Sequence, residues 1–89
     1  MQVQILYGSS ITSKEQLHEL LAERLAFPSY YGHNLDALHD CLSELSQPVQ
    51  LIICEKDALC ANLGDYASKF ILVLQDSADE NELLQIEYR

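Results

Sequence analysis

Acidic side chains recur at helical spacing in the middle of the chain, and their types and positions suggest a binding role. Asp36, Asp40 and Glu44 follow one another at intervals of four residues, so a helix would place their carboxylates on one face. Such like-charge pairs destabilise an isolated helix by roughly 0.2–0.5 kcal/mol each. That cost suggests a surface that binds a cationic partner, although acidic stripes also serve solubility alone.

Two other kinds of site are compatible with residue types in the same segment. A catalytic group of His39, Asp40 and Cys41 is disfavoured, because His39 and Cys41 would lie about 200° apart on a helix and could not act as nucleophile and base. A metal site of Asp36, His39 and Asp40 fits the helical spacing, but no fourth ligand is apparent. We therefore predict no catalytic residue, no metal ligand and no cofactor.

The charge of the chain favours a basic protein as its partner. The net charge is −9, from 14 acidic and 5 basic residues in a chain of 89. Residues 25–55 and 70–88 contain no Lys or Arg at all. Such a field repels phosphate backbones and anionic lipids and attracts basic proteins. We therefore predict no nucleic acid partner and no membrane partner.

Composition and cysteine usage indicate one folded domain, spanning residues 1–89, in the cytoplasm. The chain is 48% hydrophobic and 21% charged, as is usual for a globular domain. Its three cysteines are an odd number without C-x-x-C spacing, which indicates neither a disulfide framework nor a zinc site. The chain opens without an apolar leader, and its longest apolar run, 70–74, is too short to span a membrane.

The hydrophobic pattern predicts an α/β fold. Strands are expected at 2–7, 49–54 and 83–88, where apolar residues alternate or form a short buried run. Because helical segments separate these strands, we predict a small three-stranded parallel sheet packed by about four helices.

Four helical segments are predicted between the strands. The first spans about 14–25 and begins with a capping box of Ser13 and Gln16; His18 on it is expected to be solvated. The second follows Asn34, a suitable capping residue, after a loop in which Gly32 can adopt a positive φ. A short segment is expected to end at Gly64. For 65–80 a last helix is favoured, although 70–74 taken alone could equally form a strand. On that helix Lys69, Val73, Asp76 and Glu80 lie opposite the apolar side.

The run from Tyr30 to Leu42, Tyr-Tyr-Gly-His-Asn-Leu-Asp-Ala-Leu-His-Asp-Cys-Leu, resembles the barstar family of intracellular ribonuclease inhibitors. The match is long and ungapped, and chain length and element order are similar throughout. The resemblance implies a barstar-like fold and a one-to-one complex with a small, basic, secreted ribonuclease, formed by a chain that is monomeric when free. The alternative is an acidic interaction module, or an immunity protein for a different basic toxin.

The resemblance also implies a set of contact residues. Those that match the family's contact positions are Tyr30, Gly32, Asn34, Asp36 and Asp40, with Asp40 in the central place, and Asp76 and Glu80 as outer acidic contacts. We add His33, His39 and Glu44 as predicted partner-binding residues, because they lie beside these positions. Two positions depart from the family: His39 stands where tryptophan is common, and Asp76 stands where a longer acid is usual.

Overall fold

The three strands form a parallel sheet, as the sequence predicts. The structure, a computed structural model, describes all residues from Met1 to Arg89. Strand β1 (Gln2–Tyr7) pairs with β2 (Val49–Cys54), and β2 pairs with β3 (Leu84–Tyr88), so the order in the sheet is β1-β2-β3. Each crossover between parallel strands contains helices, which must pack against the sheet.

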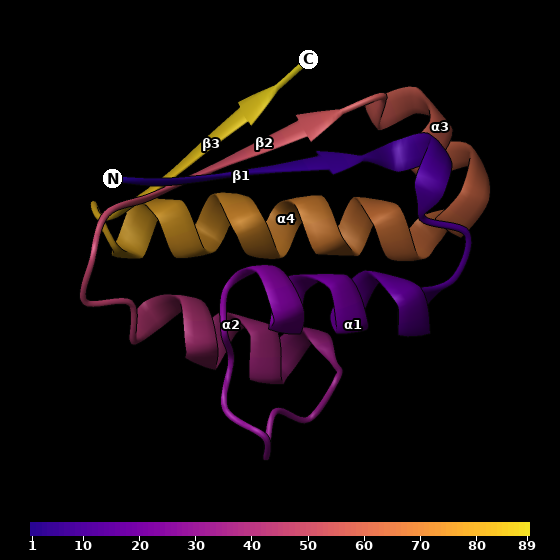
Figure 1. Ribbon diagram of the computed structural model, residues 1–89. Helices are drawn as coiled ribbons and strands as arrows, with labels where there is room; N and C mark the ends of the chain where they lie inside the picture. The colour runs from indigo at the N-terminus through magenta and orange to yellow at the C-terminus, as the bar shows by residue number, and fades with distance from the viewer.

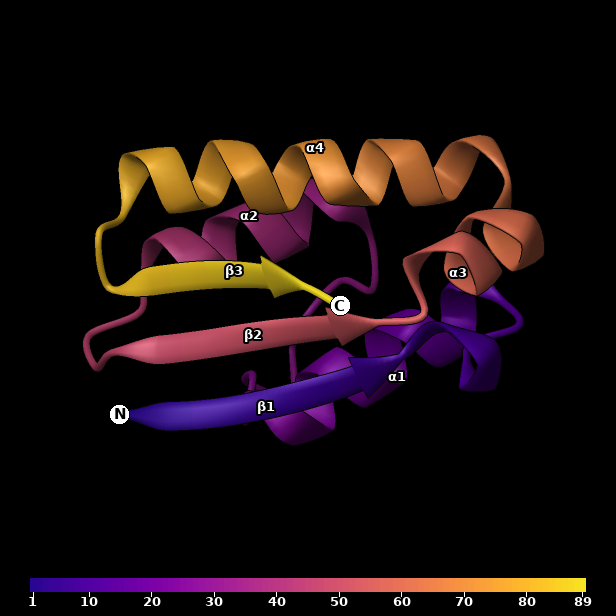
Figure 2. The ribbon, with the colours of Figure 1, turned by 90° about the horizontal axis from the view of Figure 1, so that it is seen from above.

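Four helices and one short 3-10 turn make up the rest of the fold, which confirms the predicted architecture. They are the 3-10 turn η1 (Gly8–Ser10) and the helices α1 (Lys14–Arg24), α2 (Leu35–Ser43), α3 (Lys56–Leu63) and α4 (Asp65–Glu80). Helices α1, α2 and α4 lie on one face of the sheet, whereas α3 lies at its carboxyl end (Figures 1 and 2). None of these helices combines the length and apolarity that crossing a membrane requires.

Helices α2 and α4 share the core, and this fixes the direction in which their polar faces point. Leu38 and Leu42 of α2 are fully buried, as are Phe70 and Leu74 of α4 and Leu51 of β2. Burying each such side chain contributes about 1.5–3 kcal/mol. Because α2 and α4 bury these sides against one another, their opposite sides are left at the surface.

The first helix begins as predicted, with one difference in its capping bonds. The Ser13 hydroxyl accepts a hydrogen bond from the Gln16 amide at 3.2 Å. The Gln16 side-chain oxygen accepts from the amide of Thr12, at 2.8 Å, rather than from that of Ser13. Side chains thus satisfy two amides at the start of α1. The arrangement resembles a capping box, except that the Gln16 side chain bonds the residue before the N-cap.

Candidate partner-binding surface

The loop before α2 is held in one conformation by its own side chains. The Asn34 side-chain oxygen accepts from the Ala37 amide at 2.8 Å and caps α2, as predicted, while its Nδ2 donates to the Gly32 carbonyl at 3.2 Å. The expected positive φ occurs at His33, with φ 52°, and not at Gly32. A Cβ at Gly32 would lie 3.1 Å from Asn34 Nδ2 and 3.3 Å from the Ala37 Cβ, so a side chain there would require these neighbours to shift by a few tenths of an ångström.

His18 is buried beneath this loop and bonds to it, and the prediction of a solvated His18 is wrong. Its side chain is fully buried. The Nδ1 atom lies 2.6 Å from the Tyr31 hydroxyl, and Nε2 lies 2.6 Å from the Tyr66 hydroxyl. Both ring nitrogens are hydrogen-bonded, so burial of the polar ring leaves neither of them without a partner. The buried Tyr31 is thereby fixed, and the neighbouring Tyr30 is left 83% exposed.

Titration of this cluster is shifted in the direction that keeps it neutral. Burial, and next the nearby His33, lower the pKa of His18 below its ordinary value of 6.5. Burial also raises the pKa values of the Tyr31 and Tyr66 hydroxyls. A neutral imidazole donates to one hydroxyl and accepts from the other, so all three groups are satisfied without any net charge.

The buried neutral His18 should make the protein less stable in mild acid. Because its pKa is lowered in the folded state, the unfolded chain takes up a proton more readily as pH falls through 6.5. The free energy of unfolding should therefore decrease between pH 7.5 and 5.5, by at most about 1.4 kcal/mol per pH unit from this group. Urea unfolding at both pH values tests this. A His18→Gln variant whose stability falls as steeply as that of the wild type would contradict it.

The exposed side of α2 carries carboxylates that have no ion-pair partner. Asp36, Asp40 and Glu44 are all exposed, and no cationic side chain lies within 4.0 Å of them. Together with Asp76 and Glu80 of α4 they form what we call the acidic face. Because Asp36, Asp40 and Glu44 are unpaired, their charge is available to a partner.

A hollow of about 330 Å³ lies beside Asp40, between α2 and the loop before it. Its lining residues are Pro28, Tyr30, Tyr31, Gly32, Ala37, Asp40, Cys41 and Glu44. Burial, and then the nearby carboxylates of Glu44 and Asp40, raise the pKa of the Cys41 thiol. This thiol stays protonated near neutral pH, so the hollow offers two carboxylates and two tyrosine rings but no activated nucleophile.

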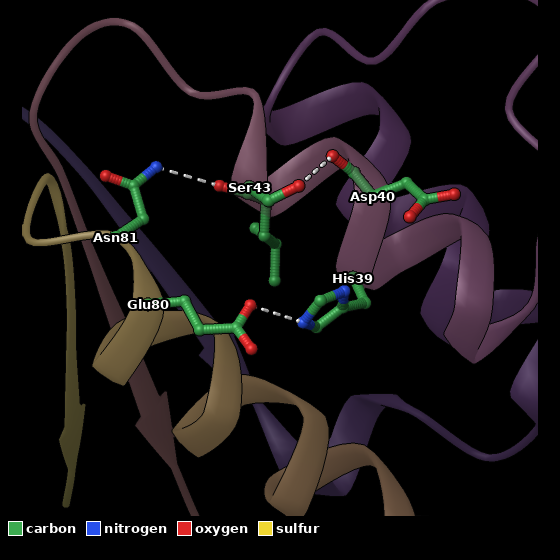
Figure 3. A network of polar contacts seen from close by, with 6 residues as sticks. His39, Asp40, Ser43, Glu80 and Asn81 are labelled. Carbon is green, nitrogen blue, oxygen red and sulfur yellow. Dashed lines mark hydrogen bonds and ion pairs between the residues drawn. The ribbon is translucent and has the colours of Figure 1, made fainter.

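His39 and Glu80 join the two helices of the acidic face. His39 Nε2 lies 2.9 Å from a carboxylate oxygen of Glu80, and both side chains are partly exposed. Figure 3 shows these two side chains pointing toward each other, while the Asp40 carboxylate points away from them. The Ser43 hydroxyl donates to the Asp40 carbonyl at 2.8 Å. Asp40 therefore does not compete with Glu80 for the His39 imidazole.

Asn81 fixes the end of α4 against the end of α2. Its Nδ2 donates to the Leu42 carbonyl at 3.1 Å, the dashed line from Asn81 in Figure 3, and also to the Leu45 carbonyl at 3.4 Å. Its side-chain oxygen accepts from the Leu83 amide at 3.0 Å. The Leu42 carbonyl also accepts from the Leu45 amide at 3.4 Å, so Asn81 adds a further donor to the chain end that follows α2. The position of Glu80 relative to α2 is thus held by backbone contacts as well as by His39.

The structure brings together most of the residues predicted to bind a partner. Tyr30, Gly32, His33 and Asn34 lie in the loop; Asp36, His39 and Asp40 lie on α2, and Glu44 is the residue that caps its end. Glu80 reaches this group through His39, and Asp76 is exposed one turn earlier on α4. No group of three or more His, Cys, Asp or Glu side chains is placed to hold a metal ion.

The chain is similar to proteins that are already known. The chain matches the family described as Barstar (barnase inhibitor) over residues 1–89. It is also 38% identical over 77 residues to a Bacillus subtilis (strain 168) protein named "Putative ribonuclease inhibitor YrdF". That alignment covers 85% of this chain and 85% of the relative.

Proposed function

This chain belongs to the barstar family of ribonuclease inhibitors, and we propose that it blocks the active site of a small, basic, secreted ribonuclease with its acidic face. The observation that carries the proposal is Asp40, an exposed and unpaired carboxylate on a capped helix beside a hollow. We propose further that the complex forms one-to-one in the cytoplasm and protects the cell that makes both proteins.

The mechanism follows from the chemistry of the enzyme that must be blocked. A ribonuclease active site is cationic, because it binds phosphate and stabilises the charge that develops during phosphodiester cleavage. A carboxylate held in the phosphate position accepts the same hydrogen bonds and contains no bond that the enzyme can cleave. We assign this role to Asp40, with Arg and His side chains of the enzyme as donors.

The loop supplies the uncharged part of the contact. Tyr30 is the most exposed of the large hydrophobic residues, and aromatic residues of this kind often contribute much of an interface's binding energy. Gly32 presents a backbone without a side chain, so an enzyme group can approach closely. Both polar groups of the Asn34 side chain form hydrogen bonds within the chain, to Gly32 and to Ala37 of α2. The role of Asn34 is therefore to keep Gly32 and α2 in place.

Titration of ribonuclease activity tests the proposal directly. The chain is added to barnase, and to a panel of other small basic secreted ribonucleases, while RNA cleavage is followed. We expect at least one enzyme to lose all activity at one molar equivalent of inhibitor. If every enzyme in the panel stays active, the proposal is wrong, and capture of another basic toxin would favour the immunity protein instead.

The outer carboxylate Asp76 should act mainly on the rate of association. Asp76→Asn is expected to slow association about threefold at low ionic strength and to leave dissociation almost unchanged, because an outer charge steers the encounter. Stopped-flow measurements at low and high salt would show the effect and its loss on screening. Asp57→Asn is the matched control, since Asp57 is exposed on α3 at the far end of α4 (Figure 1). An equal effect of both changes would contradict this role for Asp76.

A further inference from the structure

A second hollow borders the acidic face and has a different chemistry. It has a volume of about 350 Å³ and lies where α1, α2 and α4 begin. Lys14 of α1 and Lys69 of α4 line it, and His33 and Asp36 belong both to this hollow and to the proposed contact surface. We call it the lysine pocket. It holds two of the five basic residues of a chain whose net charge is −9.

The two lysines have no visible task within the chain. Neither ammonium group pairs with a carboxylate within 4.0 Å, although Glu15 and Asp36 line the same pocket. Lys14 is the first residue of α1, where the helix dipole disfavours a positive charge. Its ammonium lies 5.8 Å from the centre of the Tyr66 ring, a weak contact for an exposed lysine. Neither lysine is therefore in an ion pair, and the charge of Lys14 lies at a helix start, where it destabilises α1.

A cationic enzyme docked on the acidic face would reach this pocket. A typical inhibitor interface buries about 800 Å² on each partner, and the pocket adjoins Asp36 directly. Glu15 and Asp36 balance the two lysines in the sum of charges, but neither carboxylate pairs with an ammonium group. Close to the ammonium groups a basic surface is therefore repelled, unless that surface places a negative group opposite them. The pocket therefore requires a negatively charged group on the enzyme, which the acidic face alone does not require.

We propose that the lysine pocket receives a carboxylate side chain from the rim of the ribonuclease active site. This inference rests on the proposed function and adds a second, oppositely charged contact to it. Contacts of both signs fix the orientation of the partner, and they disfavour basic ribonucleases that lack an acid at that position. The pocket is thus a specificity determinant, and Lys14 and Lys69 are its functional groups.

The double variant Lys14→Gln/Lys69→Gln tests the inference through the sign of its effect. Removing two positive charges from an inhibitor of a basic enzyme should, by long-range attraction alone, speed association and tighten binding. If the pocket holds a carboxylate, dissociation should instead become about tenfold faster or more. Both rate constants are measured with the ribonuclease that the wild-type chain inhibits most tightly.

Two further variants separate charge from structure. Lys56→Gln/Arg89→Gln removes two exposed positive charges from a hollow at the carboxyl end of the sheet, where Lys56 also begins a helix and lies over a tyrosine ring. It should only speed association. Lys14→Arg/Lys69→Arg keeps both charges and should dissociate as slowly as the wild type. Circular dichroism confirms that each variant is folded.

The outcomes distinguish this inference from the proposed function. If the wild type inhibits and the Lys14→Gln/Lys69→Gln variant dissociates no faster than the Lys56→Gln/Arg89→Gln control, the lysine pocket is not a contact. The proposed function would be unaffected by that result. If the wild type inhibits no ribonuclease, the proposed function fails, and the assignment of the pocket fails with it.

Discussion

Replacing Asp40 with alanine is expected to weaken binding to the target ribonuclease by about a hundredfold or more, chiefly through faster dissociation. Asp40 is exposed, unpaired and adjacent to the hollow beside α2, so in the complex its carboxylate would be surrounded by the donors of the enzyme. Truncation removes those hydrogen bonds and leaves enzyme cations buried without a partner. Dissociation rates measured by displacement with excess unlabelled inhibitor would show the effect.

Glu44→Ala is the matched control for Asp40→Ala. Glu44 is an exposed carboxylate that follows α2 and lines the same hollow, four residues beyond Asp40. Glu44→Ala should weaken binding by less than about tenfold, mainly through slower association, because Glu44 contributes to long-range attraction more than to the central contact. The complex of barnase with barstar is the reference case for both effects. Equal losses for Asp40→Ala and Glu44→Ala would contradict the central role of Asp40.

Replacing His18 with alanine is expected to destabilise the protein by about 3 kcal/mol. The change leaves a cavity under the loop and removes the partner of two tyrosine hydroxyls, both at 2.6 Å. Because Tyr31 is one of them, the loop that carries Tyr30 and Gly32 should loosen as well. Binding should then weaken even though His18 is buried and touches no partner.

Urea unfolding of His18→Ala, followed by circular dichroism, measures this loss. Glu19→Ala is the control, because Glu19 is the next residue of α1 and is exposed. Surface changes of this kind usually alter stability by less than about 0.5 kcal/mol. If His18→Ala costs no more than Glu19→Ala, the buried network does not anchor the loop.

The fold could be predicted because it depends on patterns that are local in the sequence. The alternation and apolar runs at 2–7 and 49–54 mark strands, and the spacing of Phe70, Leu74 and their neighbours marks a helix. Asn34 could be assigned as a cap because capping needs only the next three residues. The acidic stripe on α2 is equally local, which is why α2 could be proposed as a binding helix.

The contacts that shape the surface could not be predicted, because they join residues far apart in the chain. His18 lies on the buried side only because Tyr31 and Tyr66 satisfy it, and nothing near His18 announces either partner. The pairing of His39 with Glu80 depends on how α2 packs against α4. The lysine pocket likewise exists only because the starts of three helices meet. Contacts of this kind explain why the sequence wrongly predicts a solvated His18.

Competition between the chain and a substrate analogue tests the central claim most directly. The inhibitor is titrated into the target ribonuclease at increasing concentrations of a 2′-deoxy oligonucleotide, which occupies the active site but lacks the hydroxyl needed for cleavage. If Asp40 takes the place of a substrate phosphate, the apparent dissociation constant of the inhibitor will rise in proportion to the analogue concentration. An affinity that does not change when the active site is saturated would mean that the chain binds elsewhere on the enzyme.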